Sequence, residues 1–367
     1  GAAIALVGLS PGHGGALTAL ALPATAARQL LVPALLALAF QAIRKPGRAE
    51  LGTLAAGSLV LAVVHPTYAI FVWLPLAGYV CVRYVWTRLE LPEGIAVLAA
   101  LGIPAALFFV LLIPIIGDTT SVSPGESEIA RALRHYAGQL HVHSETSYAM
   151  DPDVYGRAGA VAVAALLVIP LAGFAARRRW AAYVIGSAIA VFAITLLPAL
   201  FVPFSDLVSL SQSRRFAGFL PFAFALAGGL GVVAAKLGRA SLPVAFVAGV
   251  LLQWLTPGDF GYSLDDGGPA AVTWWAVLGT IAALVVGLVR KRPPLEVTAG
   301  LASALFLLPI YVHGLTQWTP SPARPASPLS EGLLEAIDAK VKPGSVVYST
   351  PEVSYRLAAV APVFICV

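Results

Sequence analysis

The sequence predicts an all-α polytopic membrane helix bundle of about ten spans, followed at its C-terminus by the start of an α/β domain. Hydrophobic residues make up 59% of the 367 residues and charged residues only 11%, and the mean hydropathy is +0.85. An ordinary soluble domain has roughly 25% charged residues. Because a chain this apolar cannot cover itself with polar side chains, lipid must form part of its solvent.

Apolar stretches bounded by charged or turn residues define the candidate spans. A span perpendicular to the bilayer needs ~20 residues, and several of these stretches are shorter. The second and third meet at His65-Pro66-Thr67, either as a tight hairpin or as two broken helices. The predicted spans are 29–43, 51–64, 67–82, 93–115, 156–176, 180–201, 216–235, 241–255, 272–289 and 296–313.

Lys and Arg placement predicts the orientation of these spans. If the basic loop 44–48 is cytoplasmic, alternation places 83–92, 177–179, 236–240 and 290–295 on the same side. These five segments hold more than half of the 23 Lys and Arg residues. The positive-inside rule then predicts a multi-pass protein with its C-terminal tail outside the cytoplasm. We expect the membrane to be the plasma membrane.

Acidic residues support the same orientation. Only four of the 18 Asp and Glu residues fall on the predicted cytoplasmic side, namely Glu50, Glu90, Glu93 and Glu296. The formal net charge of +5 is therefore explained by membrane topology. No nucleic-acid partner is needed to explain it.

A long loop, 117–155, is predicted to lie outside the membrane on the far side. Connections of this length are usually functional or packed on the surface of the protein. Within it a helix is expected from about Gly125 to Leu140. Ile129, Leu133, Tyr136 and Leu140 would form one apolar stripe on that helix, suited to lying on the membrane or on neighbouring loops.

The C-terminal tail has a different composition. We divide the chain into a membrane domain at 1–315, a Pro/Ser-rich linker at 316–328 and the beginning of an α/β domain at 329–367. The tail has an amphipathic helix (Leu329 to Val341), a β-like run (Ser345 to Ser349), a helix capped by Thr350 and a second β-like run from Pro362. Alternating helices and strands are typical of α/β domains. Since the chain has no initiator Met and stops within an apolar run, we expect it to be a fragment open at both ends.

Cationic residues on the predicted outer side form a candidate phosphate-binding set. Arg214 and Arg215 lie where an outer loop enters a helix, against the positive-inside tendency. Arg side chains bind phosphate in a bidentate manner, and they also snorkel to lipid headgroups. His65 is either an ionisable functional group at membrane depth or a helix cap, and Arg28 would lie on the same side.

Three residues of the outer loop have the spacing of a metal site. In an extended segment His141, His143 and Glu145 project from one face, so they are candidate ligands for a divalent metal. A solvated loop segment is the alternative. Other outer carboxylates are candidate Mg²⁺ or Mn²⁺ ligands or general bases, unless they lie in ordinary solvated turns; these are Asp151, Asp153, Asp259, Asp265 and Asp266.

Four passages of the chain carry a resemblance to a known family. They are Ala27–Pro33, the turn His65-Pro66-Thr67-Tyr68, Ser213-Arg214-Arg215-Phe216 and the tail Gly344–Glu352. With the predicted architecture, they resemble GT-C-type glycosyltransferases, polytopic enzymes that transfer a sugar from a polyprenyl-phosphate donor on the outer face. The tail is similar to the outer α/β segment of actinobacterial members of that family.

The resemblance implies that a carboxylate deprotonates an acceptor hydroxyl while cationic groups stabilise the departing lipid phosphate. Arg214 and Arg215 suit the second role. The family's acidic catalytic residue lies in the first outer loop, which we expect upstream of Gly1, so no residue here receives that role. The implied partners are the lipid bilayer, a polyprenyl-phosphate sugar donor and a glycan or lipid acceptor.

The alternative is a non-enzymatic envelope membrane protein, or a lipid or polysaccharide transporter, with its tail as a partner-binding domain. A proton- or ion-coupled transporter is disfavoured, because the spans hold almost no ionisable residue near mid-membrane. An Asp or Glu near the membrane in the preceding outer loop would favour the transferase over this alternative.

Overall fold

The computed structural model describes residues 23–88, 90–120, 126–156, 159–256, 294–317, 329–349, 353, 357 and 361–366. The chain divides into two compact units, residues 1–264 with 268–318 and residues 265–267 with 319–367. We describe each unit by itself.

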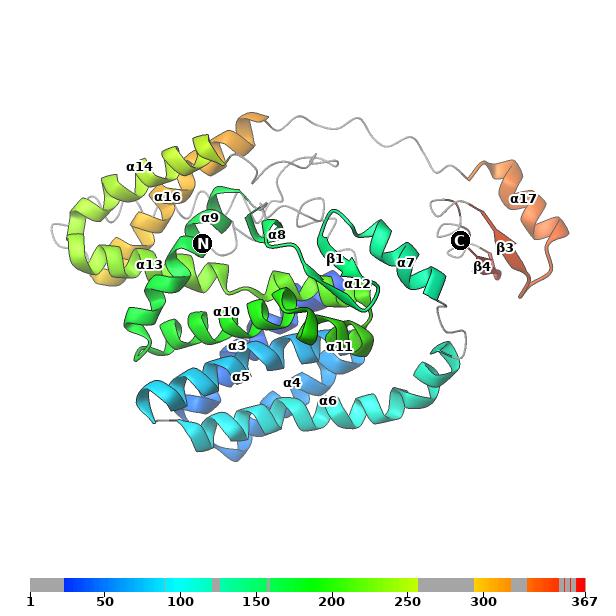
Figure 1. Cartoon of the computed structure of the whole chain (residues 1–367), viewed down its shortest axis with the longest axis horizontal. Helices are drawn as coiled ribbons and strands as arrows, with labels where there is room; N and C mark the ends of the chain where they lie inside the picture. The colour runs from blue at the N-terminus through cyan, green and yellow to red at the C-terminus, as the bar shows by residue number, and fades with distance from the viewer. Residues whose placement is uncertain are drawn as a thin grey trace. The chain divides into compact units, whose positions relative to one another are not determined.

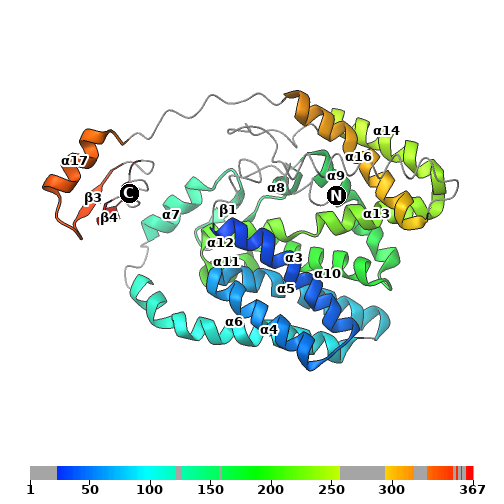
Figure 2. The same ribbon diagram turned by 180° about the vertical axis from the view of Figure 1, so that it is seen from behind.

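The first unit is almost entirely helical (Figures 1 and 2). Its long helices are α3 (Pro23–Arg44), α4 (Arg48–Val64), α5 (Pro66–Thr87), α6 (Leu91–Thr120), α9 (Ala160–Ala172), α10 (Arg179–Leu196), α11 (Pro198–Val208), α13 (Phe222–Leu237), α14 (Ser241–Leu255) and α16 (Leu295–Gln317). Shorter elements connect them: α7 (Glu126–His135), β1 (Leu140–Ser144), β2 (Ser147–Met150), α8 (Asp153–Gly156), η1 (Gly173–Ala175), α12 (Leu210–Ser213), η2 (Arg214–Phe219) and η3 (Gly238–Ala240).

Membrane-helix character is confirmed for this unit. Among the described residues, four helical segments are long and apolar enough to cross a bilayer, namely Pro66–Thr87, Leu91–Pro114, Arg179–Leu196 and the stretch Leu210–Leu255. The chain therefore has the character of a helical membrane protein, with helices long and apolar enough to span a bilayer. The number of ten spans stays a prediction, and the expected span 272–289 lies outside the described residues.

Prolines set several helix boundaries that differ from the predicted spans. The span expected at 180–201 breaks at Leu197, whose extended backbone (φ −98°, ψ 113°) precedes Pro198. The span expected at 216–235 starts only at Phe222, because Leu220 is extended before Pro221. Proline disfavours the α conformation in the residue before it and has no N–H to continue a helix. The helix found in place of the expected span 156–176 is also shorter, since α9 runs from Ala160 to Ala172, but here no proline marks the start.

Two groups of helices make up the core of this unit. The larger packs α3, α4, α5, α6 and α10 together (Figure 1), with α5 and α10 in close contact where Gly78 faces Gly186. The smaller packs α9, α13, α14 and α16 around Leu307 and Phe306. Helix α5 has 22 residues and is therefore about 33 Å long, so its two ends lie in different surroundings. We call them the His65 end, where α5 begins, and the Arg83 end, where it finishes.

An ion-pair cluster holds the Arg83 end together. The Glu90 carboxylate accepts hydrogen bonds from Tyr79 Oη (2.9 Å), Arg83 Nε (3.0 Å) and Arg179 Nε (2.7 Å). We name these four residues the Glu90 cluster. Burial raises the pKa of Glu90, but the hydrogen bonds from Arg179, Arg83 and Tyr79 outweigh it, so the pKa lies below its usual value. The cluster thus joins α5, the start of α6 and the start of α10.

Residues 126–156, which we call the outer segment after their predicted side of the membrane, form an ordered layer rather than an open loop. The predicted helix from Gly125 to Leu140 is too long, since α7 ends at His135 and Leu140 begins a strand. Strands β1 and β2 pair antiparallel, with Leu140 opposite Met150. Leu133, Leu140, Tyr148 and Met150 are buried against Phe201 of α11, whereas Ile129 is exposed. The layer therefore packs onto α11.

The second unit contains α17 (Glu331–Lys340), β3 (Val346–Tyr348) and β4 (Phe364–Cys366). Ser330 caps α17, because its Oγ accepts a hydrogen bond from Leu333 N (3.2 Å). Strands β3 and β4 pair in parallel, with Val346 opposite Phe364. The helix and both strands occur where the sequence predicts them. The helix expected after Thr350 lies largely outside the described residues, and a complete α/β domain stays a prediction.

Candidate functional site

The predicted phosphate-binding arginines lie on a broken helical segment at the His65 end. Helix α11 stops at Val208, and Ser209 adopts φ 76° and ψ 151° before α12 begins. This backbone region is almost restricted to glycine, and such strain is frequent at functional sites. The short helix α12 then leads into η2, whose first two residues are Arg214 and Arg215.

Arg214 is half-buried and fixed by the outer segment. Its guanidinium stacks on the Tyr136 ring, 3.5 Å from the centroid, and its Nη1 donates to Gln139 Oε1. Cation–π contact and the hydrogen bond together fix the side chain in one orientation. Arg214 Nε and Gln212 Oε1 are buried without a hydrogen-bond partner among the described residues. One donor and one acceptor at this point are therefore available to a polar ligand or to water.

Arg215 is exposed, and no ion pair to it is found in the described part of the chain. Its neighbour Phe216 is fully buried and anchors η2. The two adjacent guanidiniums therefore differ: one is held in the protein and the other is free to reach a ligand. Each is a donor suited to phosphate oxygens.

His65 approaches the same segment through an aromatic contact. It is the residue between α4 and α5, its Nδ1 lies 2.9 Å from Thr67 Oγ1, and its ring stacks on Tyr68 with centroids 3.9 Å apart. The Tyr68 ring in turn contacts Phe219 of η2 at 5.7 Å. The single-residue connection shows that α4 and α5 meet as a tight turn. His65 is thus linked to η2 by one intervening ring.

An aromatic cluster around Phe71 packs η2 against the start of α5. Phe71 lies 5.2 Å from Phe216, 5.3 Å from Phe219 and 5.8 Å from Phe204, measured between ring centroids. Aromatic pairs at these separations add to the stability gained by burial. The cluster fixes η2 on the start of α5.

Arg28 is the fourth predicted residue of the set. It lies in α3, but its side chain is outside the described residues. Its place in the site stays a prediction.

Of the predicted metal ligands His141, His143 and Glu145, only the two histidines are seen to lie together. Both imidazoles project from β1 and meet edge to face, 4.6 Å between centroids, while Glu145 lies in the turn after the strand. Among the described residues no group of three His, Cys, Asp or Glu is arranged to hold a metal ion. Bound Mg²⁺ or Mn²⁺ stays a prediction, and we route no chemical step through it.

The outer carboxylates give no catalytic constellation in the described part of the chain. Asp151 Oδ1 accepts the Asp153 N–H (2.8 Å) and so caps the start of α8, which is a structural role. Asp259, Asp265 and Asp266 lie outside the described residues.

Sequence reasoning missed the partners of Arg214. The sequence pattern places Tyr136 in an apolar stripe, and nothing in the sequence marks Gln139 as a partner of an arginine. Both lie 75 or more residues before Arg214 in the chain, and only the folding of the outer segment brings them together.

Docking of the outer segment gives a first prediction. Tyr148 Oη hydrogen-bonds Ser205 Oγ of α11 (2.7 Å), and both residues are buried. In Tyr148→Phe we expect a loss of about 1 kcal/mol, since Ser205 keeps its bond to the Val202 carbonyl. Limited proteolysis should then cut the 126–156 segment faster than in the unchanged protein. An unchanged cleavage rate would show that this bond does not hold the segment.

Comparisons of the chain with protein-family models, curated proteins and solved structures find no match. The functional argument therefore depends on the residues and geometry described above.

Proposed function

We propose that this chain belongs to a membrane glycosyltransferase of the GT-C type, which moves a sugar from a polyprenyl-phosphate donor to an envelope acceptor. The observation that carries the proposal is the pair Arg214 and Arg215, one fixed by Tyr136 and Gln139 and the other exposed. Neither is needed to neutralise a protein carboxylate in the described part of the chain. Their charge is left for an anionic ligand.

In the proposed reaction the acceptor oxygen forms a bond to the anomeric carbon of the sugar. The bond between that carbon and the phosphate oxygen breaks, and polyprenyl phosphate leaves with the electron pair. The acceptor hydroxyl gives its proton to a carboxylate, which the described residues do not identify. Arg215 and Arg214 would stabilise the negative charge that develops on the leaving phosphate.

The two arginines have different proposed roles. Arg214 has its guanidinium plane fixed by the Tyr136 ring, so it would orient the phosphate without losing further conformational freedom. Arg215 is exposed and would close onto the phosphate when the donor arrives. The stack of His65 on Tyr68, which contacts Phe219, places an ionisable ring beside the same segment.

Donor binding tests the proposal. In the full-length protein, Arg215→Gln should weaken binding of a radiolabelled polyprenyl-phosphate sugar about tenfold or more, because a hydrogen bond to a charged group is lost. Arg48→Gln is the matched control: Arg48 is also exposed but begins α4, at the opposite end of that helix from His65. Its donor affinity should not change.

Two results would contradict the assignment. If an Arg214→Ala/Arg215→Ala double variant binds donor as tightly as the unchanged protein, the phosphate does not bind at η2. If the full-length protein binds the donor but transfers no sugar to any envelope acceptor fraction, the non-enzymatic or transport alternative is favoured.

A further inference from the structure

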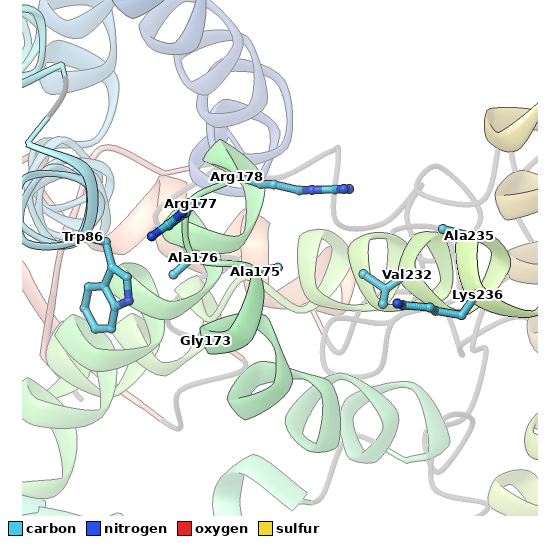
Figure 3. A pocket seen from close by; sticks show the side chains of 9 residues that line it. All are labelled: Trp86, Gly173, Ala175, Ala176, Arg177, Arg178, Val232, Ala235 and Lys236. Atoms are coloured by element: carbon cyan, nitrogen blue, oxygen red, sulfur yellow. The ribbon is translucent and has the colours of Figure 1, made fainter.

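A second cationic site lies at the Arg83 end, far from η2. A cavity of about 490 Å³ is bounded by the end of α5, by η1 and the turn after it, and by the last turns of α13 (Figure 3). Its volume falls in the range of ordinary ligand pockets. Its nine lining residues are Trp86, Gly173, Ala175, Ala176, Arg177, Arg178, Val232, Ala235 and Lys236.

Three of the lining residues are basic and none is acidic. Arg177 and Arg178 follow η1, and Lys236 comes from α13. In Figure 3 the Arg177 side chain points toward Trp86, and Lys236 extends from α13 toward the η1 side. Cations from separate elements therefore surround one cavity.

The nearby Glu90 cluster does not neutralise these cations. Glu90 pairs with Arg83 (3.0 Å) and Arg179 (2.6 Å), and these are the two ion pairs found among the described residues. Buried Arg83 also donates through Nη1 to the Arg177 carbonyl. The cluster thus fixes the main chain of the cationic turn, while the charges of Arg177, Arg178 and Lys236 remain uncompensated by any described carboxylate.

The remaining lining is apolar and suited to lipid. Trp86 is half exposed at the end of a helix long and apolar enough to cross a membrane, and Trp is enriched where such helices meet the interface. Val232 is also an exposed apolar residue, as are Val85, which precedes Trp86 in the chain, and Leu237, which follows Lys236. An anion with an acyl chain satisfies both kinds of surface, since basic residues at the membrane attract anionic headgroups.

We propose that this cavity binds the phosphate of an anionic lipid headgroup, with the acyl chain lying along Trp86 and Val232. This site is separate from the proposed donor site, because the two lie at opposite ends of α5. The inference does not depend on the proposed function.

Lipid binding to the full-length protein in detergent tests the inference, with native mass spectrometry to count bound lipids. We expect phosphatidylglycerol to bind, and phosphatidylcholine to bind at least about tenfold more weakly. Arg177→Gln/Lys236→Gln should weaken phosphatidylglycerol binding about tenfold or more. Trp86→Ala should also weaken it, by a smaller factor.

The matched control is Lys45→Gln/Arg48→Gln, which removes two exposed basic residues, one between α3 and α4 and one at the first position of α4. This control should keep its affinity within twofold. Equal losses in the two double variants would show attraction by net charge alone and would overturn the site. Displacement of the lipid by an equal concentration of sodium phosphate would overturn lipid as the occupant. All three variants alter exposed side chains, so unchanged thermal unfolding should accompany each result.

Discussion

Replacement of Glu90 by Gln is expected to cost the folded protein about 3 kcal/mol or more, because it leaves a buried arginine without its counter-charge. The Arg83 side chain is only 6% exposed and that of Glu90 only 13%. The neutral amide has one acceptor oxygen for the three donors of Tyr79, Arg83 and Arg179. Thermal unfolding of the full-length protein in detergent measures the loss.

Glu93→Gln is the control for this change. Glu93 lies in the first turn of α6, three residues after Glu90, and none of the ion pairs found among the described residues involves it. Its substitution should change stability by less than about 0.5 kcal/mol. Equal destabilisation by Glu93→Gln would contradict the role given to the Glu90 cluster.

The same cluster predicts a direction for the pH dependence. The pKa of Glu90 is lower in the folded protein than in the unfolded chain, because hydrogen bonds from Arg179, Arg83 and Tyr79 outweigh the effect of burial. Its contribution is therefore complete above the unfolded pKa and is lost as the pH falls through the folded pKa. Unfolding measured between neutral and acid pH should show this loss, and Glu90→Gln should lack that part of it. Parallel pH profiles for the two proteins would contradict the assignment.

Sequence patterns predicted the membrane helices because burial in lipid depends on local composition. Helices α5 and α6 coincide with two predicted spans within a few residues, since an apolar run long enough to cross a bilayer is visible in the sequence itself. The errors at Leu197 and Leu220 had a visible cause, because each precedes a proline. Applying that restriction would have moved both boundaries.

Tertiary contacts were not predictable in this way. Glu90 was noted as an acidic exception on the basic side of the membrane, but its partner Arg179 is 89 residues away and depends on the packing of α5 against α10. Likewise, Arg214 and Arg215 are equivalent in the sequence, and only the fold of the outer segment separates a held guanidinium from a free one. Pairings of this kind depend on the whole fold.

Substitution of Gly186 by Ala is expected to disrupt the α5–α10 contact on which the Glu90 cluster depends. A Cβ at Gly186 would lie 2.5 Å from Tyr79 N and closer still to the Gly78 carbonyl. Because main-chain atoms cannot rotate away, the helices must separate, at a cost of about 1–3 kcal/mol. Gly231→Ala in α13 is the control, since an added Cβ there would meet no atom within 4 Å apart from its chain neighbours and the backbone of its own helix; it should be neutral or stabilise by up to about 1 kcal/mol.

The effects of Gly186→Ala and Glu90→Gln on stability are expected to be non-additive. Tyr79 and Arg83 come from α5 and Arg179 from α10, so separating these helices also weakens the hydrogen bonds to Glu90. In Gly186→Ala/Glu90→Gln the second change should therefore cost less than it does alone, by about 0.5 kcal/mol or more. Thermal unfolding of the two single variants and the double variant measures this difference. Strict additivity would mean that the Glu90 cluster forms independently of the glycine contact, and the α5–α10 packing would then not be what positions Arg179.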